Sequence, residues 1–246
     1  MKKYLLLIIL IVIWELLSHS ALIPSFMLPS PEESIRALAE NIGLIGYHLS
    51  ISLTEALAGL ALSIAFSFII SVIMDRFELM EKIVFPALVV SQTIPVIAIA
   101  PLLVLWLGYG ILPKVVLIFL VCFFPVAVSL TTGFKQVDRD RVRLFQSMNA
   151  GYFVILREIK IPEALPSFFS GLKIAVAYSV VGAVIAEWLG GQAGLGVYMT
   201  LARKSFAYDE MFAIIIVISV VSLILTKIVE IIEVRAMPWK NPKEGK

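Results

Sequence analysis

Long apolar stretches alternate with short polar segments along most of the chain. A membrane span needs roughly 20 mostly apolar residues to cross about 30 Å of hydrocarbon. Six windows meet this requirement or come close to it: Tyr4–Leu22, Leu53–Met74, Ile83–Trp106, Val115–Thr131, Leu172–Trp188 and Met211–Ile232. The pattern predicts an all-α, polytopic membrane protein with about six transmembrane helices.

The positions of lysine and arginine predict the orientation of these spans, because cytoplasmic segments of membrane proteins carry an excess of both residues. With the amino terminus in the cytoplasm, sixteen of the 20 Lys and Arg residues fall on the cytoplasmic side. Those that fall outside are Arg36, Lys114, Arg203 and Lys204. The bias predicts a protein of the cell membrane with both termini cytoplasmic.

We expect one transmembrane domain, residues 1–246. Its predicted parts are a first span in 1–22, an external segment in 23–52, the second to fourth spans in 53–131, a cytoplasmic segment in 132–171, the fifth and sixth spans in 172–234 and a cytoplasmic tail in 235–246. The first span begins like a secretory signal, with two lysines before an apolar core. Trp14 and Glu15 interrupt that core and no clear small-x-small site follows, so we expect it to be uncleaved.

The cytoplasmic segment Thr132–Gly171 contains a run with helical spacing of apolar and charged residues, RVRLFQSMNAGYFVILREIKI. This run is interrupted at Asn149, Ala150 and Gly151. Because Asn and Gly tolerate a left-handed backbone, the segment is expected to form a helix–turn–helix. Pro162 and Pro166 are expected to end or restart helices, because proline has no N–H for the helical ladder.

The second helix of this pair would carry Tyr152, Phe153, Ile155 and Leu156. Apolar side chains close to water favour a docking element that a partner covers. The alternative is a loop folded against its own membrane domain. The residues alone leave both interpretations open.

The composition agrees with a membrane protein. The chain is 60% hydrophobic and 15% charged, with a mean hydropathy of +0.99, whereas soluble domains carry about 25% charged residues. The lone Cys122 excludes an internal disulfide. His19 and His48 are too few and too isolated to predict a metal site.

Motifs of catalysis are missing from the sequence. It has no phosphate-binding G-x-x-x-x-G-K-[ST] loop, no H-E-x-x-H and no G-x-S-x-G. The glycine-rich stretch LGGQAGLGVYM lacks the lysine of a phosphate loop. We therefore predict neither catalytic residues nor an enzymatic activity for this chain.

Few ionisable residues fall within the spans, where such residues are candidates for function. Glu15, Glu55, Lys227 and Glu230 lie toward span ends and are expected at the membrane interface. Glu187 ends the fifth span, before the glycine-rich stretch. This place in the sequence is compatible with a position at the membrane interface or with a position on a transport pathway.

The third span is the most polar at its start. Ser91, Gln92 and Thr93 precede Pro95, and Pro101 follows. Such a sequence predicts a broken helix, which is tolerated at membrane depth where it lines a cavity or is buried in protein. The prolines are compatible with a pathway or with packing alone.

The stretch IKIPEALPSFFSGLKIA resembles the cytoplasmic loop motif of permease subunits of binding-protein-dependent ABC importers, in the branch that includes nitrate, sulfonate and taurine systems. The residues at matching places are Ile159, Ile161, Pro162, Ala164, Leu165, Pro166, Gly171 and Leu172. The chain departs from the motif where the family's glycine falls on Asn149 and its E-A-A triplet on Arg143, Leu144 and Phe145. Asn in place of Gly is a mild change, whereas losing the acidic residue removes a possible partner contact.

The resemblance covers nearly the whole chain. IWELLSHSALIPSFMLPSPEESIRAL is similar to the family's first span, and SLTEALAGLALSIAFS to the start of its second. IPVIAIAPLLVLWLGYG resembles its third span, and VIAEWLGGQAGLGVYM the glutamate and glycine-rich loop after its fifth.

The resemblance implies a type I ABC importer permease. Its cytoplasmic loop would form a coupling helix on a separate ATPase subunit, with two permeases, two ATPases and an external substrate-binding protein in the assembly. ATP and magnesium would bind the ATPase, no cofactor would bind this chain, and no nucleic acid would be involved. The residues expected in ATPase coupling are Asn149, Ala150, Gly151, Tyr152, Phe153, Arg157, Glu158, Pro162, Pro166 and Gly171; those expected on the pathway are Ser91, Gln92, Thr93, Pro95 and Glu187.

Two other functions compete with this interpretation. An ion-coupled secondary carrier would be expected to show internal repeats and charges at the membrane midplane, and the sequence contains no convincing repeat. A membrane enzyme or a structural scaffold has no catalytic constellation to support it. For a permease of this branch, the solutes implied are nitrate, sulfonates such as taurine, or a vitamin precursor such as the thiamine pyrimidine.

Overall fold

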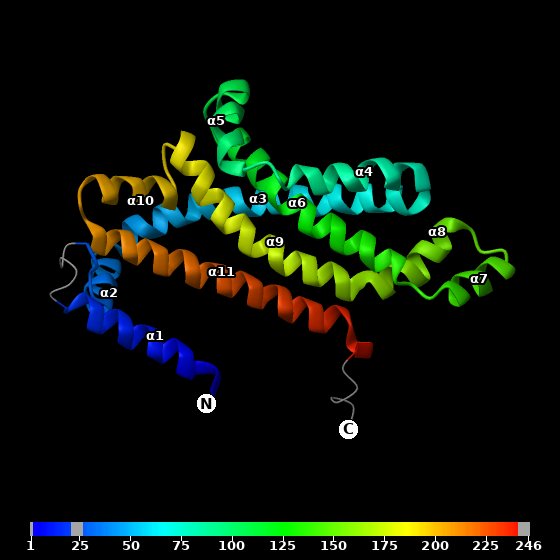
Figure 1. Ribbon diagram of the computed structural model, residues 1–246, viewed down its shortest axis with the longest axis horizontal. Coiled ribbons are helices and arrows are strands. Elements are labelled where there is room, and N and C mark those ends of the chain that lie inside the picture. Colours follow the sequence, from blue (N-terminus) through cyan, green and yellow to red (C-terminus); the bar gives the residue numbers. More distant parts are fainter. Residues whose placement is uncertain (1, 21–26, 241–246) are drawn as a thin grey trace.

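The structure, a computed structural model, describes residues 2–20 and 27–240, and every regular element among them is a helix. Long helices run side by side along the molecule, with short helices at both ends (Figure 1). The elements are α1 Lys2–Ser18, α2 Pro31–Glu40, α3 Ile42–Arg76, α4 Glu78–Ser91, α5 Val96–Leu107, α6 Ile111–Lys135, α7 Arg139–Ser147, α8 Tyr152–Ile155, the π-helical segment η1 Leu156–Lys160, α9 Ile161–Gly190, α10 Leu195–Lys204, α11 Tyr208–Ala236 and the 3₁₀ segment η2 Pro238–Lys240.

Four helical units are long and apolar enough to cross a membrane: α3, α6, the continuous unit Tyr152–Gly190 and α11. They contain the predicted second, fourth, fifth and sixth spans. The predicted third span, Ile83–Trp106, is instead a pair of helices, α4 and α5, bent by 100°. Counting this bent pair as one span gives five among the described residues.

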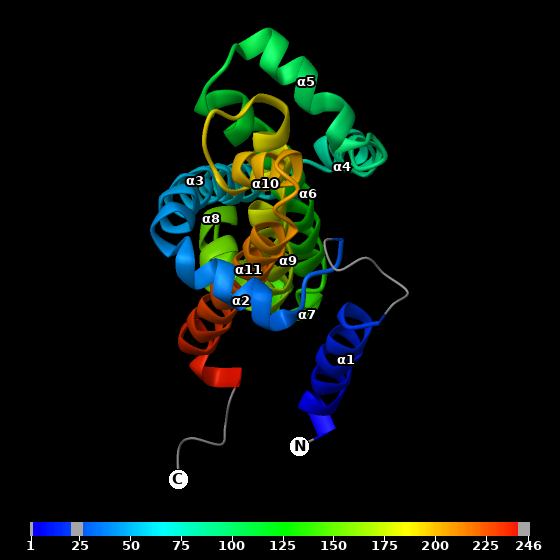
Figure 2. The same ribbon diagram turned by 90° about the vertical axis from the view of Figure 1, so that its left-hand side faces the viewer.

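The predicted first span is shorter than expected. Helix α1 ends at Ser18, and residues 21–22 of the predicted span lie outside the described part of the chain. Helix α1 lies to one side of the other helices (Figure 2). Its Trp14 donates from the indole N–H to the carbonyl of Pro29 (2.9 Å) and packs 5.6 Å, ring to ring, from Phe212 on α11.

Much of the predicted cytoplasmic segment 132–171 is continuous with the membrane helices. Helix α6 extends to Lys135, and Tyr152–Gly190 forms one helical unit of 39 residues. The expectation that Pro162 and Pro166 end or restart helices holds only for Pro162, which lies where α9 begins. Pro162 lies in the first turn of α9, directly after the wider π-helical turns of η1, and Pro166 continues the helix. Proline is tolerated in a first helical turn because an N–H there would have no helical partner in any case.

One face of α3 carries a residue of defined chemistry every fourth position. We call this set the α3 stripe: Glu55, Gly59, Ser63, Ser67, Ser71 and Asp75. All three serines are fully buried and donate to carbonyl oxygens of α6, at Phe119 (3.1 Å), Phe123 (2.9 Å) and Ala127 (3.1 Å). The same offset of 56 residues in each bond shows that α3 and α6 run parallel.

Small residues bring the core helices close together, as is common between helices in membranes. A Cβ at Gly59 would lie within 2.6 Å of Ile118 on α6. Gly171 lets α9 approach α6, since a Cβ there would overlap the carbonyl oxygen of Pro125 and the side chain of Ser129. Helix α6 thus makes its most extensive contacts with α3 and α9.

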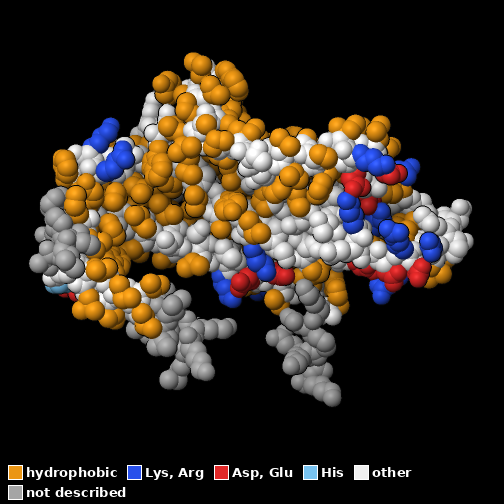
Figure 3. Space-filling model, in the orientation of Figure 1, with side chains coloured by type: hydrophobic (Ala, Val, Ile, Leu, Met, Phe, Trp, Pro, Cys, Tyr) orange, Lys and Arg blue, Asp and Glu red, His pale blue; other side chains and the backbone are white. Residues whose placement is uncertain are grey.

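Charged side chains gather at the end of the molecule where α7 and α8 lie (Figure 3). Helix α10 and the start of α11 lie at the opposite end (Figure 1). These are called the α7 end and the α10 end below. The long helices α3, α9 and α11 connect the two ends.

The close approach at Gly171 generates a stability prediction. Gly171→Ala places a methyl group against α6 backbone and should lower the free energy of unfolding by about 1–3 kcal/mol, the usual range for overpacking. Gly46→Ala on α3 is the matched control, because the described residues leave open space around that position. Thermal unfolding of the purified protein in detergent measures both. Equal stability of the two variants would contradict the contact between α6 and α9 at this point.

Candidate functional site

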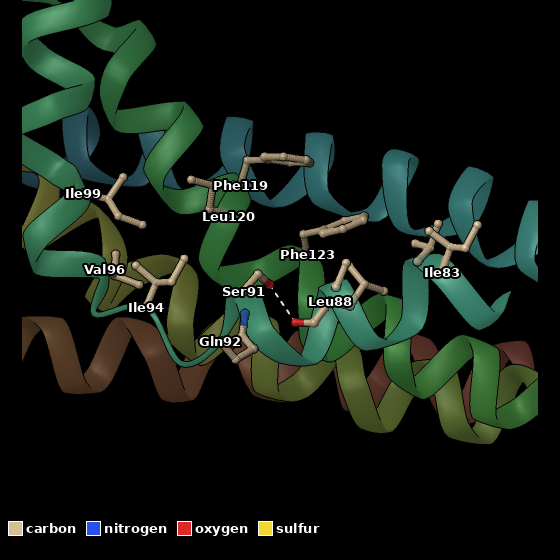
Figure 4. A pocket seen from close by; sticks show the side chains of 12 residues that line it. Ile83, Leu88, Ser91, Gln92, Ile94, Val96, Ile99, Phe119, Leu120 and Phe123 are labelled. Atoms are coloured by element: carbon tan, nitrogen blue, oxygen red, sulfur yellow. Dashed lines mark hydrogen bonds between the residues drawn. The ribbon is translucent and has the colours of Figure 1, made fainter. Parts of the chain in front are cut away.

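The bend between α4 and α5 lies beside a cavity of about 410 Å³. Its lining, as far as the structure describes the chain, contains no charged side chain (Figure 4). Ser91 and Gln92 supply the polar groups, and the rings of Phe119 and Phe123 stack 5.3 Å apart on α6. The site can accept a ligand of low charge that has flat apolar surface and a few hydrogen-bonding atoms.

The sequence around the bend explains its position. Thr93 and Pro95 lie in the turn between α4 and α5, and Pro95 directly precedes the first residue of α5. Proline disfavours the α conformation of the residue before it, here Ile94, so α4 cannot continue as a helix through this point. The hydroxyl groups of Ser91 and Thr93 donate to carbonyls one turn earlier, at Leu88 (2.7 Å) and Val90 (2.8 Å).

Of the residues predicted on the pathway, Ser91 and Gln92 line this cavity. Thr93 and Pro95 shape the turn next to it. Glu187 does not line it; it is buried elsewhere, toward the α10 end, with 1% of its surface exposed. Glu187 is therefore neither exposed at the protein surface nor part of this cavity.

Glu55 does not have the exposed side chain expected of a charged residue that snorkels at a span end. Its side chain is 3% exposed and accepts a hydrogen bond from Lys114 Nζ at 2.6 Å. Lys114 was expected in an external loop, but only 8% of its side chain is exposed. The prediction of exposed side chains failed because each of these two residues supplies a hydrogen-bond partner for the other inside the protein. The signal in the sequence was the presence of opposite charges toward the same end of two spans.

The other ionisable residues toward span ends have exposed side chains, as the sequence predicts. Glu15 pairs with His19 at 3.5 Å, and Lys227 pairs with Glu230 at 2.7 Å on the surface of α11. Each pair lies within one helix turn and is exposed. These residues therefore supply no buried site.

The first amides of α10 are held by side chains from two other helices. The three bonds run from Gly194 N to His48 Nδ1 (3.0 Å), from Leu195 N to Ser52 Oγ (2.8 Å) and from Gly196 N to Glu187 Oε2 (2.6 Å). A helix begins with backbone N–H groups that have no partner inside the helix, and it favours negative charge there. The carboxylate of Glu187 thus caps α10. Gly194 has a φ of +124° that other residues rarely adopt.

His48 has a structural position rather than a metal-binding one. Its Nδ1 accepts from Gly194, and its ring stacks 5.1 Å from that of Tyr198. The Tyr198 hydroxyl donates to Glu210 at 2.9 Å. Burial and this hydrogen bond to a carboxylate raise the pKa of Tyr198 above its ordinary value.

At the α7 end, the predicted helix–turn–helix is confirmed. Helix α7 ends at Ser147, α8 begins at Tyr152, and Asn149 between them has a φ of +60°. Helix α7 buries none of its residues. Four large apolar side chains of this segment are exposed: Leu144 (58%), Met148 (72%), Phe153 (77%) and, less so, Val154 (48%).

The expected exposure of the α8 segment is only partly correct. Ile155 and Leu156 are buried within the chain. The Tyr152 hydroxyl donates to Asp75 Oδ2 (2.9 Å) at the end of the α3 stripe and contacts the Val72 carbonyl (3.2 Å). Lys160 donates to both oxygens of Asp75, at 2.7 and 2.8 Å. Tyr152 therefore fastens α8 to α3, whereas Phe153 points away from the chain.

The remaining residues predicted in coupling have varied positions. Asn149, Gly151, Arg157 and Glu158 are exposed, and Ala150 is half-buried. Glu158, Pro162 and Pro166 line a groove together with Trp239. Gly171 is buried in the helix core against α6.

Comparison with known proteins extends these observations. A family model described as "Binding-protein-dependent transport system inner membrane component" matches residues 59–237. The chain is 37% identical over 235 residues to the formylaminopyrimidine transport permease protein ThiX of Halalkalibacterium halodurans, covering 95% of this chain and 94% of that protein. It is 35% identical over 225 residues to a probable ABC transporter permease protein of Haemophilus influenzae, covering 92% of each. The taurine transport system permease protein TauC of Escherichia coli is 30% identical over 238 residues, covering 94% of this chain and 86% of TauC.

Among solved structures, a chain of an amino acid ABC transporter solved with histidines matches with a TM-score of 0.66 at 15% identity, covering 81% of this chain and 97% of that one. At this identity the match shows the fold, which is that of a type I importer permease. The family model and the relatives confirm the family resemblance in the sequence. The chain belongs to the binding-protein-dependent transport system inner membrane components, as an integral membrane permease subunit of an ABC importer that works with a substrate-binding protein and hydrolyses ATP on a separate subunit.

Proposed function

We propose that this chain forms, together with a second copy, the membrane pathway for a small neutral heteroaromatic solute of the formylaminopyrimidine class. The observation that carries the proposal is the uncharged cavity at the bend between α4 and α5. An external binding protein would deliver the solute there. The sequence implies a wider set of solutes that includes nitrate and sulfonates. The absence of charged side chains from the described cavity lining supports a neutral solute over these anions.

The cavity suits a neutral ring better than an anion. An ion moved into apolar surroundings without a paired charge loses several kcal/mol or more of hydration free energy. A flat aromatic solute would instead pack against Phe119 and Phe123, and aromatic pairs contribute about 0.5–1.5 kcal/mol beyond buried area. The Gln92 amide offers both donors and an acceptor, which matches the ring nitrogens and amino groups of a pyrimidine. The greater identity to ThiX than to TauC points to the same class.

An ion-coupled carrier is not favoured. The chain belongs to a family of ABC permeases, and its buried charges are paired with one another rather than arranged along the cavity. ATP and magnesium would bind the partner ATPase and no cofactor would bind this chain.

Uptake by the complete transporter tests the proposed solute. Proteoliposomes would contain this permease, its ATPase and its binding protein, with labelled formylaminopyrimidine, taurine or riboflavin. ATP-dependent uptake of formylaminopyrimidine alone is the expected result. Uptake of taurine in its place would overturn the assignment, because taurine carries two full charges, a sulfonate and an ammonium, and has no aromatic ring.

A second experiment tests the cavity. Gln92→Ala removes one neutral hydrogen bond, worth about 0.5–1.5 kcal/mol, and should raise the KM for uptake by about twofold to tenfold. Thr93→Ala is the control, because the Thr93 hydroxyl bonds to the carbonyl of Val90 at the end of α4 and lies outside the cavity lining. Equal effects of the two substitutions would contradict a pathway through this cavity.

We further propose that the α7 end is cytoplasmic and docks the ATPase. The docking surface consists of Leu144, Met148 and Phe153, which are exposed apolar side chains at the most charged end of the molecule. The excess of Lys and Arg on the same side supports this orientation. Both termini would then face the cytoplasm, and two permeases would bind two ATPases.

Phe153→Asp tests this surface. A carboxylate in place of an apolar contact should abolish copurification of the ATPase with the permease, because it would be buried without a partner. Tyr152 is unsuited to the test, since its hydroxyl bonds inside the chain. Phe206→Asp is the matched control: Phe206 is 72% exposed at the α10 end and has a φ of +59°, which Asp tolerates. Retention of the ATPase by Phe153→Asp, or its loss in both variants, would contradict the proposed docking surface.

A further inference from the structure

Three ionisable side chains meet inside the protein toward the α10 end. Glu55 comes from α3, Lys114 from α6 and Glu187 from α9. Glu55 is 3% exposed, Lys114 6% and Glu187 1%. Two carboxyl groups and one ammonium group therefore lie in a region from which water is largely excluded.

The hydrogen bonds of these groups leave one atom unsatisfied. Glu55 Oε1 accepts from Lys114 at 2.6 Å, but Glu55 Oε2 is buried and has no hydrogen-bond partner among the described residues. Glu187 reaches α3 one turn before Glu55, because its Oε1 accepts from the hydroxyl of Ser52. Both oxygens of Glu187 already accept hydrogen bonds, from Ser52 at 2.6 Å and from Gly196 at 2.6 Å.

The direction of the surrounding hydrogen bonds assigns the charges. Ser52 Oγ accepts from Leu195 N, so its hydroxyl proton is free to point at Glu187. Glu187 thus receives two donors at the positive end of α10, and both features stabilise a carboxylate there. Glu55 receives one donor, from Lys114, and its other oxygen receives none among the described residues.

The neighbouring groups supply no second cation. His48 accepts at Nδ1 from Gly194, as a neutral imidazole does. Tyr198 and Glu210, beyond His48, bond to each other. With both carboxyls ionised, the cluster would carry a net charge of −1 in a low-dielectric interior, which costs several kcal/mol for each uncompensated ion.

We propose that the Glu55–Glu187 pair is a proton-binding site that holds one proton on Glu55 Oε2, donated toward Glu187. This proton gives Glu55 Oε2 a hydrogen bond and makes the cluster of Glu55, Lys114 and Glu187 electrically neutral. Two carboxyl groups at close range commonly share one proton, because both cannot ionise side by side without penalty.

The bound proton is linked to the conformation of the α10 end. Glu187 and Ser52 hold the first amides of α10, so loosening α10 would hydrate the cluster and allow Glu55 to ionise. Acid therefore stabilises the closed arrangement, and rising pH weakens it. In the proposed orientation this site responds to the pH outside the cell.

Infrared spectroscopy of the purified protein tests the proposal directly. The carbonyl stretch of a protonated carboxylic acid at neutral pH should be present in the parent and lost in Glu55→Gln. Glutamine copies the neutral acid in shape and charge, and it can donate to Glu187, so the variant should fold. Glu40→Gln, an exposed position on α2, is the matched control and should keep the band. Absence of the band from the parent, or its persistence in Glu55→Gln, would overturn the proposal.

The pH dependence of thermal unfolding supplies a second readout that a merely structural residue would not change. A free glutamate in the unfolded chain ionises near pH 4.3, so the folded parent binds one more proton than the unfolded chain above that pH. Its Tm should fall as pH rises, with a slope that Glu55→Gln loses and Glu40→Gln retains. The same slope in sodium and in potassium chloride is expected; a band and slope that vanish in sodium would indicate a bound cation and overturn the proton site. Neither measurement depends on the transported solute, so failure of the proposed function leaves this test intact.

Discussion

The α3 stripe determines how the two ends of this protein are connected. Its residues recur every fourth position from Glu55 to Asp75, along a ridge of the helix surface. In lipid, helices gain little from burying apolar surface, and small residues with hydrogen bonds between helices take that role. The three stripe serines each bond the backbone of α6, and Gly59 removes the side chain that would hold α6 away. The two ionisable ends of the stripe add further bonds: Glu55 binds Lys114, which is also on α6, and Asp75 binds Tyr152 of α8 and Lys160 of η1.

Helix α9 and the segments before it form a second connection between the ends. The unit Tyr152–Gly190 has 39 residues, about 58 Å at 1.5 Å per residue. Tyr152 binds Asp75 near its beginning, and Glu187 caps α10 near its end. Both long units are therefore fixed to each other close to the α7 end and again close to the α10 end. A displacement of the docking surface would reach the cap of α10 through two helices that are packed against α6 along most of their length.

The sequence predicted those features that depend on neighbouring residues. The apolar windows located four of the spans, Asn149 located the turn before α8, and Pro95 located the bend beside the cavity. Contacts between residues far apart in the chain were not predictable in this way. Glu55 and Lys114 are separated by 59 residues and Ser52 and Glu187 by 135, so each looked like a solitary charge or hydroxyl toward a span end. The sequence did not predict one continuous helical unit through Pro162, because this proline follows a π-helical segment and no local pattern predicts where such a segment forms.

The α4–α5 pair lacks the features that hold α3, α6 and α9 together. Its bend leaves backbone groups of the turn without a continuous helical ladder, a state tolerated at membrane depth only beside a cavity or within protein. Its contacts with α6 are far fewer than those of α3 or α9, and no serine ladder joins them among the described residues. Packed interfaces resist gradual deformation, so movement concentrates at the interfaces that are least packed. Helices α4 and α5 are thus free to change the shape of the cavity, whereas α6, which forms its other wall, stays packed in the core that connects the docking surface to the α10 cap. In the proposed function, the wall of the cavity that moves is therefore separate from the helices that transmit force.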